Sequence, residues 1–200
     1  MNSTTYNSPL REAQSAATSQ RILEAVAVVL ERGDEPTYAG VAQVAGCQER
    51  TVYRHFPTRD ALAAAFWDWQ YSILGPRDWT VGTEDGLLAL IDRSFRAFDA
   101  HPELIKAMLH TGHGRAARLS ENEQRRAMAE RCVDDAVPGL DPKSRRQAAA
   151  ASQLLFSAAA WEVFRDYWDM DGEQGAETAS LALTAMLEGL RRSSTPEPHN

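Results

Sequence analysis

The side chains with the clearest chemical potential lie between residues 48 and 59. Gln48, Arg50 and Arg54 suit the edges of base pairs, because Gln can pair with adenine and Arg can donate to both O6 and N7 of guanine. Donors of the kind that bond to phosphate oxygens occur around them in the sequence, namely Thr37, Thr51, Tyr53, His55 and Arg59. This composition favours a surface that binds duplex DNA, although a solvated helix face would have the same composition.

Helices must position these side chains. Val52 and Phe56 are the apolar residues of segment 49–56 and stand four positions apart, which predicts a short helix closed by a proline. Apolar spacing also predicts a helix over 18–33 and a shorter one over 37–46, each ending at a glycine. Two short helices joined by a glycine-containing turn, with a third helix before them, are typical of a helix-turn-helix unit.

The run GCQERTVYRHFPTRDAL at residues 46–62 resembles the signature of the TetR family of transcriptional regulators, and YRHFP is its most specific part. Residues 20–25 and 37–45 resemble the first two helices of that family. The resemblance implies a dimeric, all-helical, ligand-responsive repressor that binds a roughly palindromic operator in double-stranded DNA. Activation in place of repression stays open.

The resemblance also implies roles for single residues. It puts Thr37, Tyr53, His55 and Arg59 on the DNA backbone and Gln48, Arg50 and Arg54 at base edges. Two positions depart from the family pattern. Gly40 stands where the family often has an acidic residue, which predicts a less stable second helix, and Cys47 replaces an aliphatic residue in the turn.

The remainder of the chain also has helical spacing. Further helices are predicted at 58–74, 83–100, 102–110, 115–136, 142–169 and 173–192. No segment alternates apolar and polar residues, so strands are not expected. We predict an all-α chain of about nine helices. Its expected parts are a flexible arm at 1–17, a helix-turn-helix DNA-binding domain at 18–60, a helical ligand-binding and dimerisation domain at 61–192, and a disordered tail at 193–200.

Large apolar side chains are frequent after residue 65, and the resemblance implies that several line a cavity for a small hydrophobic or aromatic effector. The candidate lining residues are Trp67, Tyr71, Phe95, Phe98, Met108, His110, His113, Met128, Phe156, Trp161, Phe164 and Trp168. For any single apolar candidate, packing in the core is the favoured interpretation. His110 and His113 flank a glycine-rich turn, where they would bond to a ligand or remain solvated.

Small and aliphatic residues on the last two long helices would allow close helix packing, and in the TetR family the corresponding helices form a four-helix dimer interface. The candidate interface residues are Ala151, Leu155, Ala158, Leu183, Met186 and Leu190. The face of an intramolecular core would show the same pattern. A homodimer is therefore an implication of the resemblance.

Several classes of protein are disfavoured. The sequence has no apolar run of about 18 residues and no signal-peptide pattern at its start, so we expect a cytoplasmic protein without a membrane segment. Cys47 and Cys132 are expected to be free thiols and form no metal motif. The motifs GxGxxG, HExxH, GxSxG and the Walker loop are absent, so neither a cofactor nor an enzyme is expected.

The charge of the chain leaves a second class open. The formal net charge is −7, which opposes phosphate binding. Residues 1–60, however, carry six Arg against seven acidic residues, so most of the excess negative charge lies later in the chain. The alternative to a regulator is a small-molecule-binding helical protein or enzyme that binds no operator.

Overall fold

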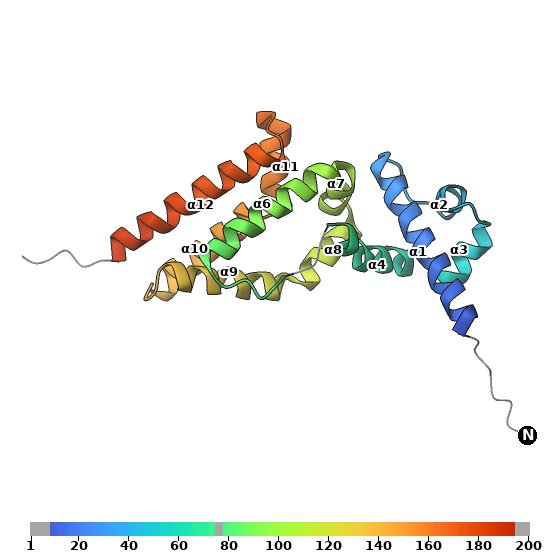
Figure 1. The fold of residues 1–200 in the computed structure, drawn as a ribbon, viewed down its shortest axis with the longest axis horizontal. Helices are drawn as coiled ribbons and strands as arrows, with labels where there is room; N and C mark the ends of the chain where they lie inside the picture. The colour runs from blue at the N-terminus through green and yellow to red at the C-terminus, as the bar shows by residue number, and fades with distance from the viewer. Residues whose placement is uncertain (1–8, 75–77, 195–200) are drawn as a thin grey trace, which may run out of the picture. The chain divides into compact units, whose positions relative to one another are not determined.

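The computed structural model describes residues 9–74 and 78–194. These residues are helical with short connections and contain no strand, which confirms the predicted all-α class (Figure 1). The chain divides into two compact units, Met1–Gln70 and Tyr71–Asn200. The predicted boundary lay at residue 60, whereas the structure groups the following helix with the first unit. No described helix is both long and apolar enough to cross a membrane.

The first unit begins with α1 (Pro9–Glu31), which is longer than predicted. Residues 9–17, expected to belong to a flexible arm, are its first turns; residues 1–8 of that arm lie outside the described part. No breaker separates Pro9 from Gly33, and proline is tolerated in the first turn of a helix. The apolar face that the sequence predicted is buried, with Ile22 and Val26 almost inaccessible to solvent.

Three shorter helices follow, namely α2 (Tyr38–Ala45), α3 (Glu49–His55) and α4 (Arg59–Trp69). Helices α2 and α4 pack with α1, and α3 packs with α2. The Thr37 hydroxyl caps α2 by accepting from the Gly40 N–H at 3.1 Å. Gly46 ends α2 with φ 63°, a left-handed conformation that favours glycine. The Thr58 hydroxyl caps α4 in the same way, accepting from the Ala61 N–H at 3.0 Å. The Gly46 cap closes a tight turn between α2 and α3.

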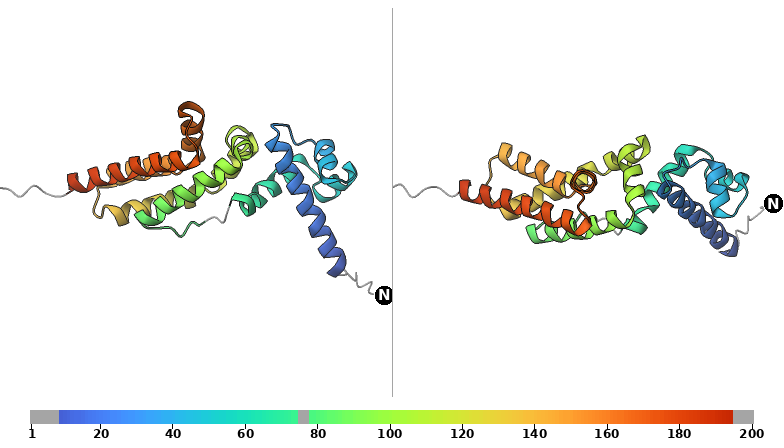
Figure 2. Two further views of the ribbon diagram at one scale, coloured as in Figure 1. Left: turned by 45° about the horizontal axis from the view of Figure 1, so that its top comes forward. Right: turned by 90° about the horizontal axis from the view of Figure 1, so that it is seen from above.

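The second unit contains the remaining helices. They are α5 (Tyr71–Leu74), α6 (Glu84–Ala100), α7 (Pro102–His110), α8 (Gly112–Ser120), α9 (Asn122–Ala136), α10 (Pro142–Leu155), α11 (Ala158–Trp168) and α12 (Gly172–Ser194). Helix α12 runs beside α6, and α9 beside α10 (Figures 1 and 2). Ile91 and Phe95 of α6 and Leu183 and Leu187 of α12 are at most 1% exposed, so they form much of this core.

Three predicted helices are divided in the structure. The predicted helix 115–136 is broken at Glu121, where φ is −107° and ψ 6°. The predicted helix 142–169 ends at Leu155, because the Ser157 hydroxyl accepts from the Ala160 N–H and starts a new helix. The predicted helix 58–74 is interrupted at Gln70. Helix α12 continues to Ser194, into the expected tail, and residues 195–200 lie outside the described part.

Candidate nucleic-acid interface and ligand cavity

Helix α3 carries the side chains predicted to contact bases. Gln48, Arg50 and Arg54 are exposed, whereas Val52 is fully buried and Phe56 is 8% exposed. Gln48 is the residue before α3, but its amide does not cap the helix. Within the described part of the chain, no carboxylate pairs with Arg50 or Arg54. The guanidinium groups are therefore available to an external acceptor.

The position of α3 is fixed from its buried side. The Tyr38 hydroxyl donates to the Phe56 carbonyl oxygen at 2.7 Å, which ties the start of α2 to the end of α3. The Tyr53 ring meets the Tyr38 ring edge-on with centroids 4.2 Å apart, yet the Tyr53 side chain is half-exposed. Tyr38 thus contacts one side of the Tyr53 ring, while part of the Tyr53 side chain stays accessible to solvent.

His55 lies at the last turn of α3, where its Nδ1 is 2.9 Å from the Ser19 hydroxyl of α1. Partial burial, and then the charge of Arg54, lower the pKa of His55 below its ordinary value. Arg59, also predicted to contact phosphate, donates to Glu35 at 2.9 Å in an exposed ion pair. Such a pair contributes little stability, so Arg59 can exchange Glu35 for another anion.

The two threonines assigned to the DNA backbone are half-buried. Thr37 uses its hydroxyl oxygen as an acceptor in the α2 cap, which leaves the hydroxyl hydrogen for an outside acceptor. Thr51 lies in the first turn of α3, one position before Val52. Thr37 thus lies at the start of α2 and Thr51 in the first turn of α3.

The second unit contains a cavity of about 590 Å³, within the range that small-molecule sites usually occupy. Of the predicted lining residues, Tyr71, Phe98, Met108 and Phe156 line it. Helices α6 to α11 contribute to its walls, together with the segment before α6. The cavity is mostly apolar but contains three charged side chains, Asp78, Arg118 and Arg125.

The other predicted lining residues do not line this cavity. Phe95, Met128 and Trp161 are at most 1% exposed and pack in the core, and Trp67 is buried in α4 of the first unit against Phe66. Phe164 packs against the Phe95 ring. His110 is exposed and its Nε2 lies 2.6 Å from a carboxylate oxygen of Glu162. His113 and Trp168 are also exposed at the surface. The predicted set of large side chains thus did not distinguish residues that line the cavity from residues that pack in the core.

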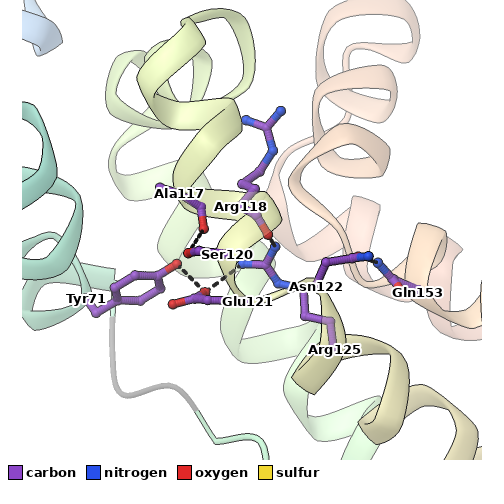
Figure 3. A network of polar contacts seen from close by, with 8 residues as sticks. All are labelled: Tyr71, Ala117, Arg118, Ser120, Glu121, Asn122, Arg125 and Gln153. Atoms are coloured by element: carbon purple, nitrogen blue, oxygen red, sulfur yellow. Dashed lines mark hydrogen bonds and ion pairs between the residues drawn. The ribbon is translucent and has the colours of Figure 1, made fainter. Parts of the chain in front are cut away.

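Sequence reasoning missed the polar end of the cavity. Arg118, Glu121 and Arg125 form a network with Tyr71 across the α8–α9 break (Figure 3). Arg125 donates to Glu121 at 3.0 Å and its guanidinium lies over the Trp79 ring at 5.4 Å. The i, i+3, i+7 spacing of Arg118, Glu121 and Arg125 would place them on one face of a continuous helix, but the helix is broken at Glu121 and only Arg125 pairs with that carboxylate.

The predicted dimer residues differ in exposure. Leu183 and Ala158 are buried within the chain, and Ala158 also lines the cavity, so these two contribute to the subunit itself. Ala151, Leu155, Met186 and Leu190 are partly exposed. Other exposed apolar side chains were not among the predicted interface residues. They include Val163 and Tyr167 of α11 and Leu181 of α12.

The described residues hold no group of three or more His, Cys, Asp or Glu side chains placed to bind a metal ion. No family model matches the chain, and no curated protein matches it.

Proposed function

We propose that this protein is a sequence-specific DNA-binding transcriptional regulator, and that it acts as a repressor released from its operator by a small molecule. The observation that carries the proposal is the outer face of α3. Gln48, Arg50 and Arg54 face solvent there without carboxylate partners in the described part of the chain, while Val52 and Phe56 hold the opposite face. The resemblance of residues 46–62 to the TetR signature supports the same function.

The chemistry of this face suits the major groove. An α-helix fits that groove, and Arg and Gln are the side chains that best distinguish guanine and adenine there. Tyr53, His55 and Arg59 would bond to phosphates on either side and set the orientation of α3. The net charge of −7 does not oppose this arrangement, since it arises mainly after residue 60.

A homodimer on a roughly palindromic operator follows from the size of α3. This helix has seven residues and contacts only a short half-site, so useful affinity needs two copies. The two α3 helices would then sit about 34 Å apart to enter successive major grooves of one face. We propose that α11 and α12 form the dimer contact, because Tyr167 and Leu181 leave 80% and 72% of their surface exposed.

The effector is proposed to occupy the cavity of the second unit. A ligand that prefers one conformation of the dimer shifts the population toward it and so changes operator affinity. This function needs no catalytic group, and we propose that the protein is not an enzyme and works in the cytoplasm.

An operator-binding assay tests the proposal. The full chain is titrated against the DNA upstream of its own coding region and against scrambled DNA of the same composition, at two salt concentrations. We expect preference for the upstream DNA of about 1,000-fold or more, with affinity that falls steeply as salt rises. Weak binding that is equal for both DNAs would support the alternative, a helical small-molecule-binding protein or enzyme without an operator.

A further inference from the structure

The cavity of the second unit contains a cation that its surroundings do not neutralise. Arg118, in α8, lines the cavity and donates to the carbonyl oxygens of Met108 and Leu109 at the end of α7. Among the described residues these carbonyls are its hydrogen-bond acceptors, and no carboxylate pairs with it. A guanidinium has five N–H donors, so donors remain for a further acceptor.

The nearest acidic group of the network is committed elsewhere. Glu121 is 6% exposed and accepts from Arg125 at 3.0 Å and from the Tyr71 hydroxyl at 2.8 Å. The Arg118 guanidinium extends away from this carboxylate (Figure 3). Asp78, the acidic residue of the cavity wall, accepts from the main-chain N–H and the hydroxyl of Thr80. Neither of these two acidic groups therefore forms an ion pair with Arg118.

The electrostatics of Arg118 agree with this geometry. Burial, followed by the charges of Arg125 and Arg115, lowers the pKa of Arg118. A guanidinium keeps its proton under all ordinary conditions, so Arg118 stays positively charged in this unfavourable environment and gives the cavity a positive potential. An anion bound beside Arg118 would stabilise this charge.

Most of the remaining wall is apolar. Leu90 and Phe98 of α6, Leu119 of α8, and Leu154 and Phe156 at the end of α10 line the cavity. These side chains surround a volume of about 590 Å³, large enough for a ring system or an alkyl chain. The site therefore combines a largely apolar wall with a guanidinium that donates to main-chain carbonyls and pairs with no carboxylate among the described residues.

We propose that this cavity binds an amphipathic organic acid, with its apolar body against Phe98 and Phe156 and its anionic head at Arg118. The inference rests on the proposed function, because it names the chemical class of the effector. A neutral ligand would leave Arg118 uncompensated, and a cationic ligand would be repelled by it. A charge-assisted, bidentate contact is the strongest that this guanidinium can make.

A matched pair of fluorescent probes tests the inference. 1-Anilinonaphthalene-8-sulfonate and N-phenyl-1-naphthylamine share their ring system and differ by one sulfonate. We expect the wild type to bind the sulfonate about tenfold or more tightly than the neutral probe, since a hydrogen bond to a charged group is worth that much. Equal binding of the two probes, or preference for the neutral one, would overturn the inference.

Substitution of Arg118 locates the effect. Arg118→Gln should weaken binding of the sulfonate about tenfold and leave the neutral probe unchanged, and Arg118→Lys, which keeps the charge but loses the bidentate geometry, should weaken it less than Arg118→Gln. Arg126→Gln, exposed on α9 and not part of the cavity wall, is the matched control and should change neither. If Arg118→Gln weakens both probes equally, Arg118 only supports the fold and the inference is wrong.

A competition experiment on the wild type remains decisive if Arg118→Gln does not fold. Decanoate and 1-naphthaleneacetate, each paired with its neutral amide, are used to displace the sulfonate probe. We expect each acid to displace it at about tenfold lower concentration than its amide, and the better acid distinguishes an alkyl from an aromatic body. Amides as effective as the acids would overturn the inference.

The outcome is independent of the operator assay. A chain that prefers the acids but binds no specific DNA supports the inference about the cavity and contradicts the proposed function. A chain that binds the operator but prefers neutral probes supports the function and contradicts the inference.

Discussion

Arg54 and Tyr53 are neighbours in α3 but should contribute to DNA binding in different ways. Arg54→Ala removes a side chain assigned to a base edge, so we expect discrimination between related operators to fall by about 1–3 kcal/mol. Tyr53→Phe removes only a hydroxyl assigned to phosphate and keeps the ring contact with Tyr38, so affinity should fall by a similar factor for every sequence. Competition binding against a panel of operator variants measures both effects.

The control for these two substitutions is Arg32→Ala, which removes an exposed arginine just beyond α1. It should leave base preference unchanged. All three substitutions are at exposed positions, so their effects on the free energy of unfolding should stay within about 0.5 kcal/mol. If Arg54→Ala lowers the affinity for every operator variant by the same factor, as Tyr53→Phe should, the assignment of Arg54 to a base edge is wrong.

His55 should make the stability of the protein depend on pH. Its pKa is lower in the folded chain than its ordinary value, because partial burial and then the charge of Arg54 disfavour the protonated ring. The unfolded chain therefore binds the proton more readily, and stability is lost as the pH falls through the ordinary histidine range of about 6.5. Urea unfolding at about pH 7.5 and about pH 5.5 should show this loss.

Replacing His55 isolates its part of the pH dependence. His55→Gln cannot titrate but keeps a polar side chain of similar length near the Ser19 hydroxyl. The variant should lose less stability than the wild type between the two pH values, since the substitution removes only the contribution of His55. An identical pH dependence in the two proteins would show that His55 is not the group responsible.

At the scale of elements, the crossing of α7 and α8 depends on one glycine. A Cβ added at Gly114 would meet the main chain of Met108, with 2.7 Å to its Cα, and the backbone cannot yield as a flexible side chain can. Gly114→Ala should therefore lower the free energy of unfolding by about 1–3 kcal/mol. Because this crossing brings Arg118 to the last carbonyls of α7, probe binding in the cavity should weaken as well.

Gly112 offers a control on the same helix. No described atom lies within 4 Å of the Cβ position there, so Gly112→Ala should be neutral or raise stability by at most about 1 kcal/mol. Urea unfolding followed by circular dichroism compares the two variants. Equal effects at the two positions would show that helix propensity, and not the close approach to Met108, sets the stability of this turn.

The sequence predicted the ends of a helix correctly where a single residue fixes the local backbone conformation. Thr37 and Gly46 bound α2, as predicted, because a hydroxyl cap and a left-handed glycine act locally. The break at Ser157 was missed because serine occurs inside helices as well as before them, and only the tertiary contacts of α10 and α11 decide which occurs. The helical extension back to Pro9 was missed because residues 9–17 lack an apolar period.

The candidate sites were predictable to different degrees for a related reason. The outer face of α3 follows from a few consecutive residues, so Gln48, Arg50 and Arg54 were assigned correctly to the exposed face of a short helix. The cavity is assembled from helices far apart in the sequence, and a buried aromatic residue such as Trp161 looks the same as a lining one such as Phe98. Arg118 was missed because its environment exists only after folding.

At the scale of the whole molecule, the proposed homodimer can be tested on α12. Leu181 is 72% exposed on the side of the helix opposite the buried Leu183, so Leu181→Glu should leave the fold intact. If the second copy covers this face, the variant should sediment as a monomer at concentrations where the wild type is a dimer. Ala127→Glu, exposed on α9, adds the same charge elsewhere and should remain dimeric. A dimeric Leu181→Glu variant would contradict the assignment of the contact to α12.

Linkage between the cavity and the operator gives the most stringent test of the regulator as a whole. If the two sites belong to one equilibrium, an acid that fills the cavity and weakens operator binding by some factor must itself bind less tightly by the same factor when operator is present. We expect a factor of about 5–150.

The measurements are operator affinity at saturating naphthaleneacetate or decanoate, and affinity for that acid at saturating operator. In Arg118→Gln about tenfold more acid should be needed for the same effect, while operator affinity without ligand is unchanged, because Arg118 lies in the second unit and touches no proposed DNA contact. Operator affinity that stays constant while the cavity is filled would show that the two sites are uncoupled, and unequal factors would show that the acid acts at a site other than this cavity.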